Sequence, residues 1–254
     1  MRKRRKRSVI RTFMRTVIAV AVLFGMWYAA RRYFTEGYPA DLEFGGQGLH
    51  LMEGEAEYPG EFKPADLPEY TGEPYTEVNG NVPFFAPEEV KPDIYESYGE
   101  LDALGRCTCA AACVGPETLP TEARKDVRVV RPSGYHNAKY SWIENGYLYN
   151  RCHLIGFQLT GQNSNERNLI TGTRYMNIEG MKPFEDSVAQ YIYGSRNHVL
   201  YRVTPVFRGQ NLVASGVLME ARSVEDPRVQ FCVYCYNVQP GVVIDYKTGW
   251  SRAE

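Results

Sequence analysis

The sequence lacks an uninterrupted apolar run long enough to cross a bilayer. The apolar core near its N-terminus, residues 17–30, has fourteen residues, whereas a membrane-spanning helix needs about 20. Residues 13–34 reach that length only if their flanking arginines extend to the interface. The segment also lacks a small-residue cleavage site, because Tyr28 precedes two alanines. We favour an uncleaved signal-anchor in residues 1–34 with its basic end in the cytoplasm over a cleaved signal peptide, and both interpretations place the rest of the chain outside.

Acidic residues are absent from residues 1–32, which carry ten Lys and Arg. Basic residues are nearly absent from residues 33–100, which carry 16 acids against only Lys63 and Lys91, a net charge of −14. Residues 101–254 hold 17 basic and 14 acidic residues, a net charge of +3, so the three regions sum to the −1 of the whole chain. This asymmetry indicates a modular chain.

Residues 35–75 lack a sustained apolar period and are rich in Gly, Pro, Glu and Tyr. Such a composition cannot bury enough apolar surface to fold alone, and it predicts a disordered acidic linker. We therefore expect the folded domain to comprise residues 76–254.

No internal repeat is visible in residues 76–254, and the pattern there alternates between strands and one helical segment. Asn145-Gly146 predicts a hairpin turn whose second strand is residues 147–150. A helix is expected over residues 173–194, interrupted around residues 180–183. The other predicted strands are residues 127–130, 198–207, 211–224 and 229–238. Strands on both sides of a helical segment predict an α+β fold with a mostly antiparallel sheet.

Six cysteines occupy three places, namely a cluster of Cys107, Cys109 and Cys113, a lone Cys152, and the pair Cys232 and Cys235. An even count in an exported chain is compatible with one or two disulfides as well as with buried thiols. A C-x-C plus C-x-x-C set also allows zinc. However, Cys232 and Cys235 lie in an alternating strand pattern that points them to opposite faces, which disfavours a shared ion.

The segment from Tyr149 to Glu185 combines a histidine, several asparagines, arginines and a glutamate. Phosphodiester hydrolysis needs an activated water, a cation on the phosphate and help for the leaving 3′ oxygen. Neutral imidazole suits the first task, and Mg²⁺ suits the other two. Because Mg²⁺ keeps several waters, one side-chain amide oxygen could anchor it.

Asn150-Arg151-Cys152-His153 resembles the Asp-Arg-Gly-His signature of the DNA/RNA non-specific endonucleases, and Asn168, Asn177 and Glu185 follow at that family's spacing. The resemblance extends over residues 83–247 and favours a membrane-anchored bacterial branch similar to DNA-entry nucleases. It implies a ββα-metal (His-Me finger) core with a mostly antiparallel central sheet, preceded by the N-terminal membrane anchor and acidic linker.

The resemblance also implies roles for individual residues. His153 would be the general base, Asn177 the Mg²⁺ ligand, and Glu185 the holder of metal-bound waters. Asn168 would position His153 or the phosphate, and Arg151 is a candidate phosphate contact. For charge stabilisation in the transition state, Arg174 and Arg106 remain alternatives. Mn²⁺ could replace Mg²⁺ as the cofactor.

Two positions depart from the signature. Asn150 replaces Asp, which removes a charge and keeps hydrogen-bonding capacity, so we expect activity to survive. Cys152 replaces Gly, from which we infer an ordinary extended backbone there.

We thus expect a membrane-bound, extracellular, Mg²⁺-dependent endonuclease cutting DNA, and RNA as well. Helix-turn-helix, zinc-finger and other base-reading motifs are absent, and the domain is only weakly basic, which favours sequence-indifferent contacts to phosphates. The alternative function is a non-catalytic, surface-anchored nucleic-acid-binding protein that retains the fold. The linker is expected to be a spacer, and a weaker hypothesis is that its polyanion mimics nucleic acid in the active-site groove.

Overall fold

The structure is a computed structural model that describes residues 43–44, 47–48 and 62–254. The chain divides into two units, Met1–His50 and Leu51–Glu254. In the first unit, β1 (Glu43–Phe44) pairs antiparallel with β2 (Gln47–Gly48). The predicted signal-anchor lies outside the described residues. Within the described part of the chain, no helix combines the length and apolar character needed to cross a membrane.

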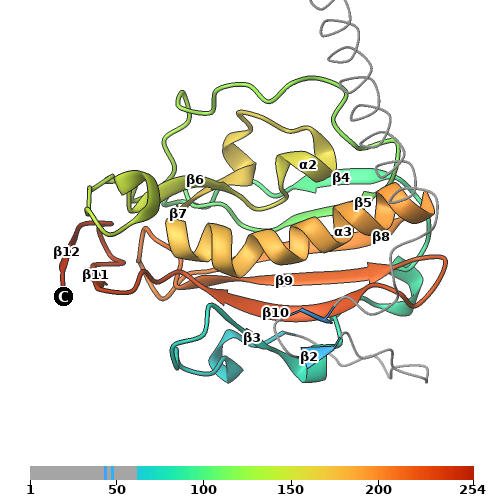
Figure 1. The fold of residues 1–254 in the computed structure, drawn as a ribbon, viewed down its shortest axis with the longest axis horizontal. Coiled ribbons are helices and arrows are strands. Elements are labelled where there is room, and N and C mark those ends of the chain that lie inside the picture. Colours follow the sequence, from blue (N-terminus) through green and yellow to red (C-terminus); the bar gives the residue numbers. More distant parts are fainter. Residues whose placement is uncertain (1–42, 45–46, 49–61) are drawn as a thin grey trace, which may run out of the picture. The chain divides into compact units, whose positions relative to one another are not determined.

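The second unit is built on a six-stranded sheet in the order β3-β10-β9-β8-β5-β4, with every neighbouring pair antiparallel (Figure 1). Its strands are β3 (Tyr75–Glu77), β4 (Tyr95–Tyr98), β5 (Ala110–Val114), β8 (Val199–Val206), β9 (Gly216–Ser223) and β10 (Gln230–Tyr236). The predicted strands over residues 198–207, 211–224 and 229–238 correspond to β8, β9 and β10. A mixed α and β fold with a mostly antiparallel central sheet is therefore confirmed.

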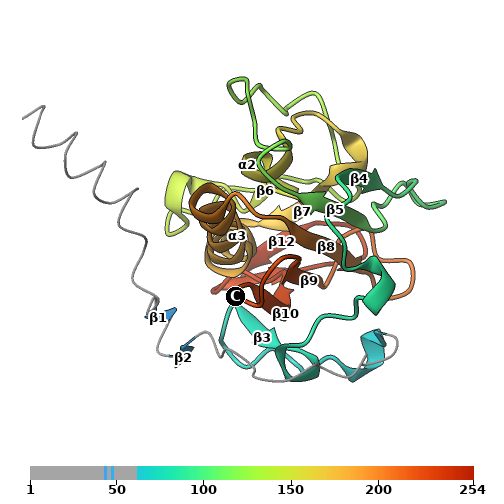
Figure 2. The same ribbon diagram turned by 90° about the vertical axis from the view of Figure 1, so that its right-hand side faces the viewer.

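One helical segment covers the middle of this sheet. A π-helical turn, η6 (Met176–Met181), continues directly into α3 (Lys182–Ser195), and Figure 2 shows the helix against one face of the sheet. Val188, Ala189 and Ile192 bury the inner side of α3 in the core. Burial of both sheet faces explains why β9 and β10 are apolar almost without alternation.

The helical segment differs from its prediction in where it begins and in having no interruption. Thr173 ends a strand, so the helix begins at Met176, and residues 180–183 do not break it. Pro183 stands at the start of α3, where a missing backbone N–H costs little. Gly180 lies against β10, where an added Cβ would come within 3.2 Å of the Cβ of Cys235. Pro183 therefore marks the junction of η6 and α3, and Gly180 marks a close contact with β10.

A two-stranded sheet stands beside the central one and consists of β6 (Tyr149–His153) and β7 (Leu169–Thr173). The strand predicted over residues 147–150 is thus shifted toward His153. The turn at Glu144–Gly146 is present, with positive φ at Asn145 and Gly146. Its first arm is not a strand, and only Lys139 bridges to Tyr147. Side chains from this arm pack instead into a local cluster with Ile143, Leu148 and Tyr149.

The strand predicted over residues 127–130 is wrong. Val130 donates its backbone N–H to Val127 O in a turn, and Val129 is 82% exposed. No strand pairs with this segment within residues 62–254. The apolar run was too short to distinguish an exposed loop from a strand.

Residues 62–75, in the segment predicted to be a disordered linker, pack on the domain. The Tyr236 hydroxyl donates to Pro68 O at 3.1 Å, and its ring lies 5.4 Å from that of Tyr70. The predicted boundary at Thr76 falls inside β3. The aromatic residues of this segment explain the difference, because they bury apolar surface on β10 that the acidic composition concealed.

The remaining elements are short. They are η1 (Pro64–Asp66), η2 (Asn79–Asn81), η3 (Pro87–Glu89), η4 (Glu144–Gly146), α2 (Phe157–Thr160), η5 (Glu166–Asn168), β11 (Val242–Ile244) and β12 (Ser251–Ala253). β11 and β12 form an antiparallel hairpin near the C-terminus.

All six cysteines are free thiols, and five of them are buried. Cys235 contacts Met219 on the helix-covered side of β10, whereas the backbone N–H of Cys232 binds Asn81. Of the alternatives left open by the sequence, the structure has buried thiols rather than disulfides.

Candidate active site

A cleft of about 410 Å³ lies where β6 ends and the helical segment begins. It is lined by Arg124, Val127, Asn150, Arg151, His153, Gly156, Phe157, Gln158, Arg174, Asn177, Ile178, Lys182 and Glu185. Five residues predicted for the site therefore meet in one place, namely Arg151, His153, Arg174, Asn177 and Glu185. Two others, Asn168 and Arg106, do not line it.

β6 presents Arg151 and His153 on the same face because alternate residues of a strand share a face. The Arg151 guanidinium lies 4.4 Å from the centre of the Tyr135 ring and donates to Val130 O and the Tyr135 hydroxyl. Arg151 thus ties the loop over residues 130–135 to the cleft, and much of its hydrogen-bonding capacity is already used.

His153 is 5% exposed. Its Nε2 lies 3.0 Å from Asn163 O, and a carbonyl oxygen can only accept, so Nε2 carries the proton in the neutral ring. Nδ1 then carries the lone pair and accepts a hydrogen bond from Nη2 of Arg124 at 3.5 Å. Burial, together with the Arg124 guanidinium, lowers the pKa of His153 to about 4. The imidazole is therefore neutral near pH 7.

Asn177 lies in the first turn of η6. Its Oδ1 accepts the Cys152 S–H at 2.9 Å, which fixes the amide orientation and leaves a second lone pair on that oxygen. Cys152 lies in β6 opposite Ile170 and does not have positive φ, so the expected extended backbone at this position is confirmed. Cys152 thus adds a contact to Asn177 that Gly could not make.

Glu185 occupies the first turn of α3 and reaches the floor of the cleft. Gly156 lies directly against it, and an added Cβ there would come within 2.6 Å of Glu185 Oε2. Burial, followed by the nearby carboxylate of Asp186, raises the pKa of Glu185 to about 8. No Lys or Arg of residues 62–254 forms an ion pair with it. A nearby cation would favour the ionised form of this carboxyl group.

The donor set of the cleft fits a hard divalent cation. The amide oxygen of Asn177 and the carboxylate of Glu185 open into the same space, and both are oxygen ligands of the type that Mg²⁺ prefers. Among the described residues there is no cluster of three or more His, Cys, Asp or Glu side chains. A cation here would keep most of its ligands as water or take them from a substrate.

Asn168 is a buried clamp on the backbone that follows His153. Its Oδ1 accepts Ile155 N at 2.9 Å and its Nδ2 donates to Ile155 O at 3.0 Å. Its own carbonyl accepts Leu154 N. Asn168 can therefore position His153 through the main chain, and it is too buried to contact a phosphate.

Arg106 does not line the cleft, and its side chain is engaged by other parts of the fold. It pairs with Asp102 at 2.7 Å, donates to Gly209 O and Asn211 O, and stacks on Phe207. Arg106 therefore does not join the other predicted residues in the cleft. Arg174 does line the cleft, where it pairs with Glu144 at 2.6 Å, and its buried Nε has no hydrogen-bond partner among the described residues.

Sequence reasoning missed Arg124, whose exposed loop contributes a guanidinium beside His153. It also missed Asn163, whose carbonyl fixes the imidazole tautomer, and Lys182 and Gln158 on the helices flanking the cleft. Arg124 precedes His153 by 29 residues in a stretch of mixed charge, and no local pattern distinguishes it from its charged neighbours.

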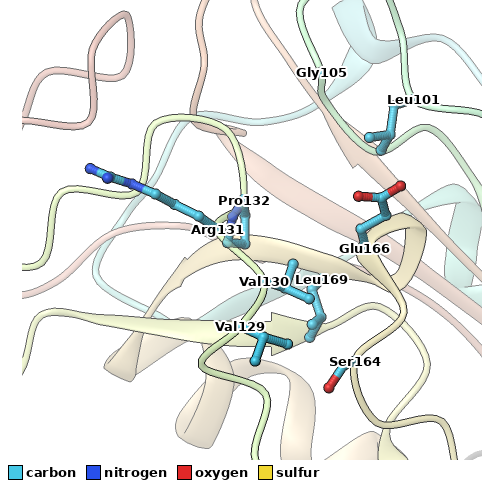
Figure 3. A pocket seen from close by; sticks show the side chains of 9 residues that line it. All are labelled: Leu101, Gly105, Val129, Val130, Arg131, Pro132, Ser164, Glu166 and Leu169. Carbon is cyan, nitrogen blue, oxygen red and sulfur yellow. The ribbon is translucent and has the colours of Figure 1, made fainter.

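A second cavity, of about 200 Å³, lies behind the loop over residues 129–132 and contains none of the predicted site residues (Figure 3). Its lining is Leu101, Gly105, Val129, Val130, Arg131, Pro132, Ser164, Glu166 and Leu169. The Arg131 side chain extends away from the others in this view. Its lining includes the Glu166 carboxylate but no imidazole and no side-chain amide, which the larger cleft has.

The family model described as DNA/RNA non-specific endonuclease matches residues 88–225, which contain every lining residue of the larger cleft. The chain belongs to this family. The fold of its second unit is accordingly that of an endonuclease domain.

Individual relatives agree with the family assignment. A deoxyribonuclease from Streptococcus dysgalactiae subsp. equisimilis is 32% identical over 115 residues, 43% of this chain and 35% of that protein, so the match spans about a third of the relative's length. NucA from Streptococcus agalactiae, solved with a magnesium ion bound, superposes with a TM-score of 0.64 at 25% identity, covering 74% of this chain and 91% of that one. The Sda1 nuclease, solved with a bound zinc ion, superposes with a TM-score of 0.57 at 28% identity, covering 63% of this chain and 81% of that one.

Proposed function

We propose that the chain is a metal-dependent, sequence-indifferent endonuclease that hydrolyses phosphodiester bonds of DNA and RNA. The observation that carries the proposal is the neutral imidazole of His153, which faces the same cleft as Asn177 and Glu185. The finer architecture follows from the same segment. β6, β7 and the helix starting at Met176 would be the two strands and helix of a ββα-metal core.

His153 is the general base in this proposal. Nδ1 takes a proton from a water molecule, the water oxygen bonds to phosphorus, and the bond from phosphorus to the 3′ oxygen breaks. The products are a 5′-phosphate and a 3′-hydroxyl. Asn163 holds the ring through Nε2, so that the lone pair of Nδ1 faces the cleft residue Arg124. The negative charge of an arriving phosphate raises the pKa of His153 from about 4 and makes the ring a better base.

Asn177 and Glu185 would hold the cation, Asn177 directly and Glu185 through bound water. A Mg²⁺ ion bound there would supply Lewis-acid stabilisation of the phosphate and an acidic water for the departing oxygen. The magnesium-bound NucA supports Mg²⁺ as the ion, and Mn²⁺ is expected to replace it.

Arg124 is the proposed phosphate clamp. It is exposed, it forms no ion pair within residues 62–254, and its guanidinium lies beside the lone pair of His153. Arg174 is the second candidate, because it lines the cleft and carries a guanidinium whose Nε has no hydrogen-bond partner within residues 62–254. Asn150 also has a buried, unpartnered Nδ2 in the cleft. These donors share the cleft with the neutral base His153, which favours catalysis over the alternative of binding alone.

The proposed location is extracellular, with residues 1–34 as a signal-anchor in the cell membrane. Its basis is the basic and apolar N-terminal sequence. Protease treatment of intact cells tests this location. Loss of the domain from intact cells supports it, and complete protection contradicts it.

Nuclease activity is tested by incubating the detergent-solubilised full chain with plasmid in Mg²⁺ beside His153→Ala and Asn177→Ala. The wild-type chain should degrade the plasmid, EDTA should stop it, and both variants should be severely impaired. Retarded migration of uncut plasmid by the wild-type chain would support the binding-only alternative instead.

A further inference from the structure

Both tryptophans of residues 62–254 are exposed, Trp142 by 55% and Trp250 by 64%. Exposed tryptophan is unusual because the indole is the largest apolar side chain to leave in water. Tyr147 adds a third exposed ring at 44%. The three lie on two neighbouring segments, residues 135–147 and the β11–β12 hairpin, at the end of the fold where the helical segment starts (Figure 1).

Direct contacts join the two segments into one surface. The Tyr140 hydroxyl lies 2.8 Å from Ser251 Oγ, and the Tyr140 ring lies 5.1 Å from that of Trp142. His136 stacks on Trp250 with ring centres 4.3 Å apart and planes 22° apart. We call Trp142, Tyr147 and Trp250, with these supporting residues, the aromatic surface.

The aromatic surface is continuous with the catalytic cleft. His136 follows Tyr135, whose ring stacks under the cleft residue Arg151 at 4.4 Å. A second contact is the ion pair between the cleft residue Arg174 and Glu144, which lies in the turn between Trp142 and Tyr147. These contacts link the aromatic surface to the cleft at Arg151 and at Arg174.

Cations are interleaved with the rings. Lys139 Nζ lies 4.7 Å above the Tyr147 ring, and the exposed Arg252 stands in β12 between Ser251 and Ala253. Aromatic faces alternating with basic side chains are what single-stranded nucleic acid binds, since bases stack on the rings and phosphates pair with the cations. A duplex hides its base faces and cannot use such rings.

We infer that the aromatic surface is a stacking site for the unpaired bases of a single-stranded nucleic acid whose backbone occupies the cleft. This inference rests on the proposed nuclease function and deepens it. The surface is a substrate-binding extension outside the catalytic groups, so it gives the enzyme a preference for single strands over duplex.

The kinetic test compares Trp250→Ala and Trp142→Ala with the wild-type full chain on a labelled single-stranded oligonucleotide and on its duplex. Each substitution should raise KM for the single strand about tenfold, with little change in kcat and a smaller effect on duplex. Trp250→Phe should restore most of the affinity because it keeps an aromatic face. Tyr193→Ala, at an equally exposed ring (56%) on α3, is the matched control and should change neither constant.

The binding test is independent of cleavage. In EDTA, the oligonucleotide should quench the tryptophan fluorescence of wild type and of His153→Ala. The affinity obtained from the quenching curve should fall about tenfold in Trp250→Ala. If neither the wild-type chain nor any variant cleaves, the proposed nuclease function fails. The quenching experiment still decides whether the aromatic surface binds single strands.

Two results would overturn the inference. One is an unchanged KM and unchanged quenching in both tryptophan variants of an active enzyme. The other is a concentration-dependent dimer in sedimentation experiments that Trp250→Ala dissociates, because a second copy of the chain would then occupy the surface.

Discussion

At the residue scale, the state of His153 governs the chemistry. A buried imidazole beside a guanidinium is difficult to protonate, and its pKa of about 4 lies well below the usual 6.5. Because the group loses its proton on titration upward through that value, the base is in its active form at all higher pH. Measured at saturating metal, kcat/KM should stay nearly constant as pH falls from 7 to about 5, and an acid limb with a midpoint at 6.5 or above would contradict this prediction.

The pKa of Glu185 is shifted in the opposite direction to that of His153. The Glu185 pKa of about 8 without metal means that this carboxyl group is largely protonated at neutral pH, so a cation must displace a proton to bind. Mg²⁺ affinity should therefore rise as pH increases toward 8 and level off above it. Calorimetry in two buffers of different ionisation enthalpy measures the released proton, and Glu185→Gln, which cannot release one, is the control. Equal proton release by wild type and this variant would refute the assignment.

At the element scale, the site depends on the junction of β6, the turn after it and the start of the helix. Asn168 holds that turn with two hydrogen bonds to Ile155. Asn168→Ala would leave a buried N–H and a buried carbonyl unsatisfied, at a cost of about 2–4 kcal/mol in the free energy of unfolding. Chemical denaturation measures this loss, with the exposed Gln190→Ala on α3 as a control expected to stay within about 0.5 kcal/mol. A loss no larger than that of the control would show that the turn does not depend on the clamp.

Several elements could be predicted from sequence because their patterns are strong. β8, β9 and β10 are long apolar runs rich in Val and aromatic residues, and the turn at Asn145-Gly146 needs positive φ. Residues 127–130 could not be placed, since a short apolar run in a loop looks like a strand until its partner is known. The same holds for Gly180 and Pro183, whose meaning depends on β10 lying beside the helix.

The candidate site shows the same division between local and long-range information. His153, Asn177 and Glu185 were identified from spacing in one segment, and they meet in one cleft. Arg124 comes from a separate loop, and Arg106 is engaged by Gly209 and Asn211, which are about a hundred residues away in the chain. Only the folded chain shows which arginine reaches the cleft.

At the scale of the whole molecule, the net charge of −1 excludes strong long-range attraction of nucleic acid. Binding of duplex, which cannot use the aromatic surface, must come from a few local phosphate contacts, for which Arg124, Arg174 and Lys182 are available in the cleft. The logarithm of the binding constant for duplex in EDTA should then fall against the logarithm of salt concentration with a slope of about −3, and Arg124→Ala should reduce that slope by about 1. A slope unchanged by this variant would place the phosphate elsewhere.

The central claim is that His153 is the base of a phosphodiester hydrolase, and imidazole rescue of His153→Ala tests it most directly. The substitution should lower the single-turnover rate of plasmid cleavage by about 10²–10⁴-fold. Added imidazole should restore part of the rate in proportion to its unprotonated fraction, without helping Asn177→Ala. Cleavage by His153→Ala at the wild-type rate would contradict the account.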